Sequence, residues 1–209
     1  PAAWPLPALP ALAALGVRRS YPKGVLLMQE GDFGDIVYVM NQGRAKVFAT
    51  DDDQREIIYG TIEPGAYFGE MALDGGVRSA SVITQEECEC AVVTQVTLRQ
   101  YVMQHPEFAF ELIDRIIARA RQATQAVRDM ALLDVYGRLS RLLDNLATPE
   151  PDAAGERPVL GTITQQEIAN RVGSSREMVS RIIKDLERGG YVALRQRRIV
   201  LLKKLPAKY

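Results

Sequence analysis

The chain has 209 residues, and its 26 Lys and Arg side chains balance its 26 Asp and Glu side chains to a formal net charge of zero. This balance excludes a uniformly basic nucleic-acid binder and a protein with an acidic tail. The charges are unevenly distributed, however. Residues 1–159 contain 15 basic and 22 acidic residues, a net charge of −7, whereas residues 160–209 contain 11 and 4, a net charge of +7. The asymmetry predicts two domains with different partners, the C-terminal one binding nucleic acid or another anionic surface.

The first 16 residues are apolar but are interrupted by Pro5, Pro7 and Pro10. Their longest apolar run is far shorter than the roughly 20 residues of a membrane helix, and no basic leader precedes it, so we expect neither a signal peptide nor a membrane span. Cys88 and Cys90 would share one face of a strand, where a disulfide does not form, and two cysteines are too few for a zinc site. Buried, reduced thiols and a cytoplasmic location are expected.

Short apolar runs separated by turn residues occupy the region from Val17 to about Thr97. This spacing indicates an antiparallel sandwich or barrel. The predicted strands are Val25–Met28, Ile36–Met40, Ala45–Phe48, Glu56–Tyr59 and Ala91–Val93. The Asp51–Asp53 run resembles part of a calcium loop, but the glycine and the distal glutamate of such a loop are absent, so a solvated hairpin tip is favoured.

After Pro106 the apolar residues recur every three or four positions, which predicts a helix over 107–133. Its apolar stripe is narrow, close to the seam of a coiled coil. The stripe either pairs with its twin in a homodimer or packs on its own β domain, and its length favours the dimer. Asp134 is expected to cap a second helix that runs to Leu146. The predicted domains are therefore 1–106, 107–133 and 134–209.

The basic segment has the pattern of a helix-turn-helix. Thr164 with Glu167 forms the signature of a capping box, Gly173 permits a left-handed turn, and Ser174–Ser175 begins a second helix that ends before Gly189. Two apolar runs, Tyr191–Leu194 and Ile199–Leu202, then flank Arg195–Arg198, which predicts a hairpin wing with a basic tip for the DNA backbone. A merely solvated charged face is the alternative, but the caps, the turn and the wing coincide.

The second helix would present side chains suited to a major groove. Arginine donates two parallel hydrogen bonds to guanine, glutamate accepts from cytosine, and serines and helix amides hold phosphate. The predicted DNA-binding residues are Thr164, Ser174, Ser175, Arg176, Glu177, Ser180, Arg181, Lys184 and Arg197.

A glycine-rich stretch between Phe68 and Val82 carries the strongest chemical signal of the β part. Gly69 and its neighbours can present bare backbone amides, Glu70 supplies an acceptor for a ribose hydroxyl, and Arg78 supplies a fork matched to phosphate oxygens. One glutamate and one arginine near a glycine turn also fit an internal ion pair, so these residues alone leave both interpretations open.

The order FGEMAL, RSASV, a long helix, LLDVYGRL and TQQEIANRVGSSREMVSRIIKDLE resembles the CRP/FNR family of bacterial transcription regulators from about residue 17 to 204. The resemblance implies an α+β protein with an N-terminal cyclic-nucleotide-binding, jelly-roll-like β-roll, a dimerisation helix over 107–133 and a C-terminal winged helix-turn-helix. It further implies allosteric control by a cyclic nucleotide, cAMP above others, and binding of a homodimer to double-stranded DNA with palindromic, TGTGA-like half-sites. RNA polymerase is an implied partner.

The resemblance also implies a set of ligand-binding residues. Gly69 and Glu70 would hold the ribose, Arg78 and Ser79 the cyclic phosphate, and Thr124 would meet the purine across the dimer seam. The complete set is Phe68, Gly69, Glu70, Met71, Arg78, Ser79, Ala80 and Thr124. The loop between Glu70 and Arg78 is shorter than in the family's cyclic-AMP receptor, and Ala123 stands where that receptor has a hydroxyl, which leaves cyclic GMP and cyclic di-GMP open as effectors.

Other classes of protein fit the sequence less well. The only histidine is His105, no cysteine has a basic setting and no Walker motif occurs, so no catalytic constellation is evident and no metal is expected. The oxygen-sensing branch of the family fits poorly because its N-terminal cluster cysteines are missing, and a haem role for His105 is disfavoured. Two alternatives remain, namely a regulator that needs no small ligand and a nucleotide sensor that acts through a protein partner.

Overall fold

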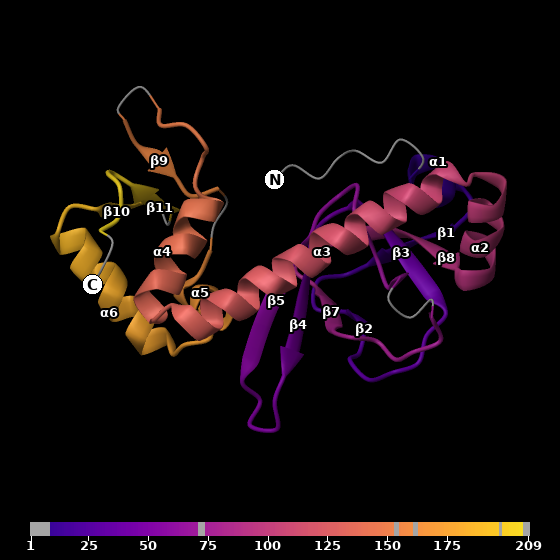
Figure 1. The fold of residues 1–209 in the computed structure, drawn as a ribbon, viewed down its shortest axis with the longest axis horizontal. Coiled ribbons are helices and arrows are strands. Elements are labelled where there is room, and N and C mark those ends of the chain that lie inside the picture. The colour runs from indigo at the N-terminus through magenta and orange to yellow at the C-terminus, as the bar shows by residue number, and fades with distance from the viewer. Residues whose placement is uncertain (1–8, 71–73, 153–154, 161–162, 197, 207–209) are drawn as a thin grey trace. The chain divides into compact units, whose positions relative to one another are not determined.

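The computed structural model describes residues 9–70, 74–152, 155–160, 163–196 and 198–206. The chain divides into two compact units, Pro1–Ala120 and Arg121–Tyr209. The helix α3 (Glu107–Leu132) belongs to both units, and the remaining elements belong to one or the other (Figure 1). The predicted α+β class is confirmed.

The N-terminal unit contains two antiparallel four-stranded sheets. The first has the order β1-β8-β3-β6 and the second the order β2-β7-β4-β5. The strands of the first sheet are β1 (Val17–Tyr21), β8 (Cys88–Thr94), β3 (Ile36–Gln42) and β6 (Tyr67–Phe68). Those of the second are β2 (Leu26–Met28), β7 (Ser81–Thr84), β4 (Ala45–Thr50) and β5 (Glu56–Ile62). Strands far apart in sequence are neighbours, which gives the roll its closed shape.

A buried apolar cluster joins the two sheets. It is formed by Met40, Ala45, Ile62, Phe68, Val82, Cys88 and Cys90. Both cysteines are free and buried, as the sequence predicts. Burial raises the pKa of the Cys90 thiol to about 12 and also raises that of Cys88.

Three helices cover the other face of the first sheet. The helices α1 (Leu9–Ala14) and α2 (Gln95–Gln104) and the start of α3 share one core with the sheet. Thr94 caps α2 by accepting a hydrogen bond from the Thr97 amide at 3.1 Å. Phe108, fully buried, fixes the first turn of α3 against this core. Leu112 is partly buried against this core, whereas seven other large apolar side chains of α3 are exposed in the single chain, namely Phe110, Ile113, Ile116, Ile117, Val127, Met130 and Leu132.

The C-terminal unit packs three helices on a small sheet of order β10-β11-β9. Its elements after α3 are α4 (Val135–Leu146), β9 (Arg157–Pro158), α5 (Gln165–Val172), α6 (Arg176–Arg188), β10 (Val192–Arg195) and β11 (Arg198–Leu201). Asp134 caps α4 as predicted, because its Oδ1 accepts a hydrogen bond from the Gly137 amide at 2.7 Å. Leu139, Leu143, Ile168 and Ile183 lie at the centre of its core.

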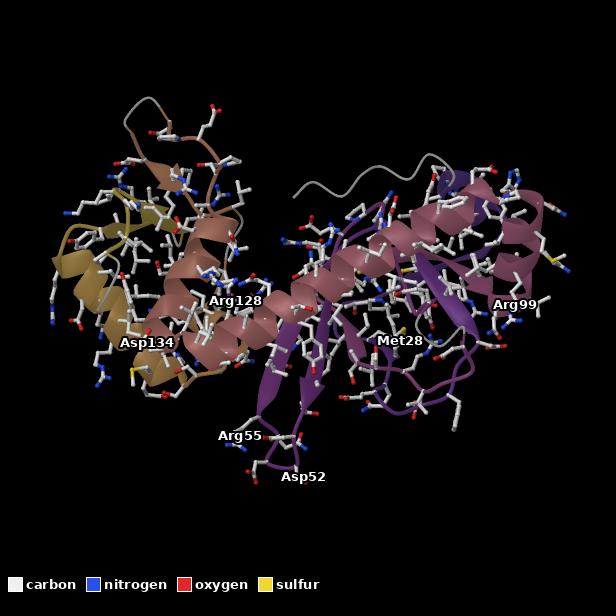
Figure 2. All side chains as sticks on the ribbon, in the orientation of Figure 1. Met28, Asp52, Arg55, Arg99, Arg128 and Asp134 are labelled. Carbon is white, nitrogen blue, oxygen red and sulfur yellow. The ribbon has the colours of Figure 1, made fainter. Side chains whose placement is uncertain are left out.

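The hairpin between β4 and β5 ends in the predicted polar tip, where Figure 2 labels Asp52 and Arg55. Asp51 Oδ1 accepts hydrogen bonds from the amides of Asp53 and Arg55 at 3.0 and 2.9 Å. These bonds and the Arg55 guanidinium hold the pKa of the Asp51 carboxyl below its usual value. The carboxylate therefore serves the turn itself, as expected for a hairpin tip.

Candidate anion pocket and helix-turn-helix surface

Arg78 is the centre of the candidate pocket in the N-terminal unit. Its backbone is held in a short antiparallel contact, with its amide donating to Asp32 O at 2.8 Å and its carbonyl accepting from the Gly31 amide at 2.9 Å. Its side chain points inward and is only 6% exposed. There Nη1 donates to Gly69 O at 2.6 Å and Nη2 donates to Ile36 O at 2.8 Å. The guanidinium is thus oriented by two carbonyl groups.

No carboxylate among the described residues lies within ion-pairing distance of Arg78. A buried charge normally has a partner of opposite charge, since desolvation without one costs several kcal/mol. The two carbonyl contacts use two of the five N–H donors of the guanidinium, which leaves three for a ligand. The arrangement is that of a site for an anion.

Gly69 lies where only glycine fits. Its φ of +93° is in the left-handed region, and a Cβ there would stand 2.8 Å from both Arg78 Nη1 and Ile36 O. Any side chain would therefore displace the arginine or the strand. The sequence predicts that Gly69 presents bare backbone amides. In the structure, the close approach of Arg78 and Ile36 explains why this position is a glycine.

Glu70 follows Gly69 and is 4% exposed. Its Oε1 forms an ion pair with Arg119 of α3, and Arg119 Nη2 also donates to Tyr67 O at 3.1 Å. The second carboxylate oxygen, Oε2, is buried without a hydrogen-bond partner among the described residues. Glu70 thus has one oxygen occupied by the protein and one available to a hydroxyl donor.

Arg119 is a site residue that sequence reasoning missed. It comes from a different element from the glycine-rich stretch, and in the helical pattern it reads as one of several charges between apolar positions. The signal was its spacing of four residues from Arg115, which places both guanidinium groups on the same face of α3. That face contacts β6, because both guanidinium groups lie over the Tyr67 ring.

The other predicted ligand residues take varied positions. Phe68 is buried and stacks on Tyr38, with ring centroids 4.9 Å apart, and Ala80 is also buried. Ser79 is exposed beside Arg78. Met71 lies outside the described residues. Thr124 is exposed on α3, in the part of the helix that belongs to the C-terminal unit, and its contact with a purine stays a prediction.

The C-terminal unit has the predicted helix-turn-helix. Thr164 caps α5 by accepting from the Glu167 amide at 3.1 Å, and Gly173 ends the helix with φ +62°. Ser175 caps α6 by accepting from the Met178 amide at 3.2 Å. Glu167 forms an ion pair with Arg171 at 2.9 Å. Thr164, Gly173 and Ser175 thus set the helix ends as predicted, whereas in the described contacts the Glu167 carboxylate pairs with Arg171 and does not return to the Thr164 amide.

One face of α6 is exposed and strongly polar. Its Arg176, Glu177, Arg181 and Lys184 point to solvent, while Ser180 is half-buried. A concave strip along the helix is lined by Glu177, Ser180, Arg181, Lys184, Asp185 and Arg188. The opposite face, with Val179, Ile182, Ile183 and Leu186, is buried in the core. The helix therefore presents hydrogen-bond donors outward on a rigid support, as a recognition helix requires.

The wing differs in detail from the prediction. Arg195 and Arg198 are paired residues of β10 and β11 and so lie within the strands, and Arg195 is followed by Gln196 with a φ of +49°. Arg195 is engaged by Glu156, with its Nη1 and Nη2 at 2.5 and 2.9 Å from the two carboxylate oxygens. The pairing of Arg195 with Arg198 depends on the register of the two strands, and the basic composition of this segment does not predict that register. Arg197 lies outside the described residues.

Ser175→Ala tests the local design of the turn. Removing the cap should lower the free energy of unfolding by about 1 kcal/mol, because the Met178 amide loses its acceptor. Urea denaturation followed by circular dichroism measures the change. Ser174→Ala is the matched control, since the described contact of Ser174 is its amide to Ala169 O. Equal losses in the two variants would contradict the assignment of Ser175 as the cap.

The described residues contain neither a metal-binding cluster nor a helix suited to cross a membrane. No cluster of three or more His, Cys, Asp or Glu residues able to hold a metal ion occurs among them. None of their helices combines the length and the apolar character needed to cross a membrane.

Comparison with known proteins gives consistent matches. The sequence-family model of the cyclic nucleotide-binding domain matches residues 18–105, and the sequence-family model of the Crp-like helix-turn-helix domain matches residues 137–206. The chain is 35% identical over 190 residues to the cAMP-activated global transcriptional regulator Vfr of Pseudomonas aeruginosa, covering 88% of each chain. It is 36% identical over 170 residues to the cAMP-activated global transcriptional regulator CRP of Haemophilus influenzae, covering 80% of this chain and 75% of that one.

Solved structures agree with these relatives. The c-di-GMP responsive global regulator CLP of Xanthomonas campestris is 27% identical and superimposes with a TM-score of 0.81, over 94% of this chain and 98% of that chain. A cyclic nucleotide-binding domain joined in one chain to a Crp-like helix-turn-helix domain defines a ligand-controlled transcription regulator. The chain belongs to the CRP/FNR family of transcription regulators and is a cyclic nucleotide-responsive member of the CRP type. The family expected from the sequence is confirmed.

Proposed function

We propose that the chain works as a homodimer that binds double-stranded DNA at palindromic, TGTGA-like sites when cAMP occupies the pocket around Arg78. The observation that carries the proposal is the buried Arg78 guanidinium, which two carbonyl groups orient and no described carboxylate neutralises. A cyclic phosphate supplies the missing anion. A ribose hydroxyl supplies the donor that Glu70 Oε2 lacks.

The charge around the pocket supports a ligand with a single phosphate. Arg78 and Arg119 carry two positive charges, and Glu70, which is paired with Arg119, carries one negative charge. The net charge of +1 is balanced by a cyclic mononucleotide and exceeded by a cyclic dinucleotide with two phosphates. This balance favours a cyclic mononucleotide over cyclic di-GMP but does not distinguish cAMP from cyclic GMP, and the cAMP-activated relatives favour adenine.

The exposed apolar stripe of α3 supports the dimer. Ile113, Ile116 and Ile117 are each between 43% and 53% exposed and Val127 is 70% exposed, on one continuous helix. Pairing of two such helices would bury these side chains and place two copies of α6 in a symmetric arrangement that matches a palindrome. Predicted base contacts come from Arg176, Glu177 and Arg181, and predicted phosphate contacts from Ser174, Ser175 and the wing.

Three further parts of the proposal rest on the family and the sequence. RNA polymerase is a partner of the DNA-bound dimer, as the resemblance implies. The protein acts in the cytoplasm, in line with its reduced, buried cysteines. It acts by binding and not by catalysis.

A titration with three nucleotides tests the proposal. Calorimetry with cAMP, cyclic GMP and cyclic di-GMP gives each affinity, and fluorescence anisotropy with a labelled palindrome gives DNA affinity with and without each nucleotide. We expect cAMP to bind most tightly and to raise DNA affinity at least tenfold. Binding of nucleotide without any DNA binding would indicate a sensor that acts through a protein partner. DNA binding with no nucleotide response would indicate a regulator that needs no small ligand.

A further inference from the structure

Arg115 and Tyr67 form a contact between α3 and β6 that lies outside the proposed pocket. The Arg115 guanidinium carbon is 4.9 Å from the centroid of the Tyr67 ring, and Nη2 reaches Gly65 O at 3.4 Å. Burial lowers the pKa of Arg115, so the group sits in a partly dry environment. One helical turn further on, Arg119 holds Glu70 and Tyr67 O. One face of α3 therefore contacts Gly65 in the turn before β6, through Arg115, and Glu70 after β6, through Arg119.

This contact surface has an unusual hydrogen-bonding deficit. Five buried side-chain atoms among the described residues lack a partner, and three of them lie in this cluster, namely Tyr67 Oη, Glu70 Oε2 and Glu111 Oε2. Burial, together with the charges of Glu70 and Glu111, raises the pKa of Tyr67 to about 12, while Arg115 and Arg119 oppose this shift. The charges of these four side chains and the Tyr67 hydroxyl thus act on one another. A buried polar atom without a hydrogen-bond partner lowers the stability of the fold. A small movement that gives these atoms partners is therefore favoured.

Occupation of the pocket would change this balance at one point. A hydroxyl donated to Glu70 Oε2 satisfies one of the three atoms and holds the carboxylate that Arg119 grips. The Tyr67 hydroxyl on β6 and Glu111 Oε2 on α3 remain without partners, beside the stretch of α3 that Arg115 fixes to Gly65 and Tyr67. A small shift of this helix face would pair them, because Arg115 and Arg119 contact β6 through polar groups, while the packing of Phe108 in the apolar core anchors the first turn of α3.

We propose that Arg115 is a positioning residue that couples occupancy of the pocket to the seating of α3, and that the Tyr67 hydroxyl, unpaired here, gains a hydrogen bond when the helix moves. The proposal rests on the proposed function. Arg115 holds the helix through Gly65 and Tyr67 and makes no described hydrogen bond or ion pair with Gly69, Glu70 or Arg78. It therefore governs the response to nucleotide without binding the nucleotide. Since α3 is continuous to Leu132, the response reaches the helix-turn-helix unit.

Arg115→Gln in the full chain tests the coupling. The affinity of the free protein for cAMP, from calorimetry, should stay within about threefold of the unmodified chain. The factor by which cAMP raises DNA affinity, from anisotropy, should fall at least tenfold. Because coupling is reciprocal, the affinity of the DNA-bound protein for cAMP should fall by the same factor. A residue with only a structural role would lower stability and leave this factor unchanged.

Tyr67→Phe is the second variant, nearly isosteric and expected to fold. Loss of a buried, unpaired hydroxyl should raise the melting temperature by a few degrees, while the cAMP-induced gain in DNA affinity falls about threefold or more. Lys23→Gln, which removes one exposed charge from the same unit, should change neither quantity. A tenfold loss of cAMP affinity in free Arg115→Gln, or full coupling in both variants, would overturn the proposal. Unchanged cAMP affinity in Arg78→Ala would instead refute the pocket itself.

Discussion

Replacing Arg78 with alanine is expected to lower the affinity for a cyclic nucleotide by at least about 100-fold. The guanidinium is the only group in the pocket placed to neutralise a phosphate, among the residues that the structure describes, and each charge-assisted hydrogen bond to it is worth about 1.5–3 kcal/mol. Calorimetry with cAMP measures the loss. The variant should also lose nucleotide-dependent DNA binding, because the effector no longer distinguishes the two states of the protein.

Two companion variants make the Arg78 result interpretable. Arg78→Ala also removes the donor to Gly69 O and Ile36 O, so its melting temperature should fall by several degrees. Arg78→Lys keeps the charge without the planar fork and should lose less affinity. Arg18→Ala removes an arginine whose side chain is 76% exposed and should bind nucleotide normally. Normal affinity in a folded Arg78→Ala protein would exclude the pocket assignment.

Replacing Arg181 with alanine is expected to weaken binding to a specific palindrome about 10- to 100-fold at constant salt. Arg181 projects from the exposed face of α6, where its Nη2 contacts only the Met178 sulfur at 2.8 Å in the described contacts. A bidentate contact of arginine with guanine discriminates by about 1–3 kcal/mol. The loss should therefore be concentrated at one base pair of each half-site, which anisotropy with a set of single-substitution sites measures.

The control for Arg181 lies on the same helix. Arg188 is in the last turn of α6 and pairs with Asp185 at 3.2 Å, so Arg188→Ala should weaken all DNA alike if it has any effect. A lost phosphate contact also reduces the slope of log affinity against log salt by about 0.9, whereas a lost base contact leaves that slope unchanged. Unaltered sequence preference in Arg181→Ala would show that another face of the protein reads the bases.

The helix-turn-helix was predictable from the sequence almost residue by residue, because its caps and turn are local. Thr164, Ser175 and Asp134 accept hydrogen bonds from amides three positions further on, and the Gly173 amide donates to Ala169 O four positions earlier, so local spacing alone predicts these contacts. The same holds for the strongly apolar strands β3 and β4. By contrast, β1 was missed because its residues are mostly exposed, and β6 because two residues carry no periodicity.

The pocket was predictable only in part. Gly69, Glu70 and Arg78 stand in one segment, and the family resemblance gives their roles. Arg119 depends on α3 lying against β6, and Arg195 depends on Glu156 reaching the wing, and both contacts join residues about 40 to 50 positions apart. Such long-range ion pairs follow from tertiary packing, which no local pattern encodes.

The buried thiols have a practical consequence. Cys90 is fully buried with a pKa of about 12, and Cys88 is 1% exposed with a raised pKa. Only the thiolate reacts with maleimides, so both native cysteines are shielded from labelling in the folded protein at neutral pH. A single cysteine introduced at an exposed site, such as Lys184 on α6, therefore accepts a fluorophore selectively in the otherwise native chain. The motion of the DNA-reading helix can then be followed directly as nucleotide is added.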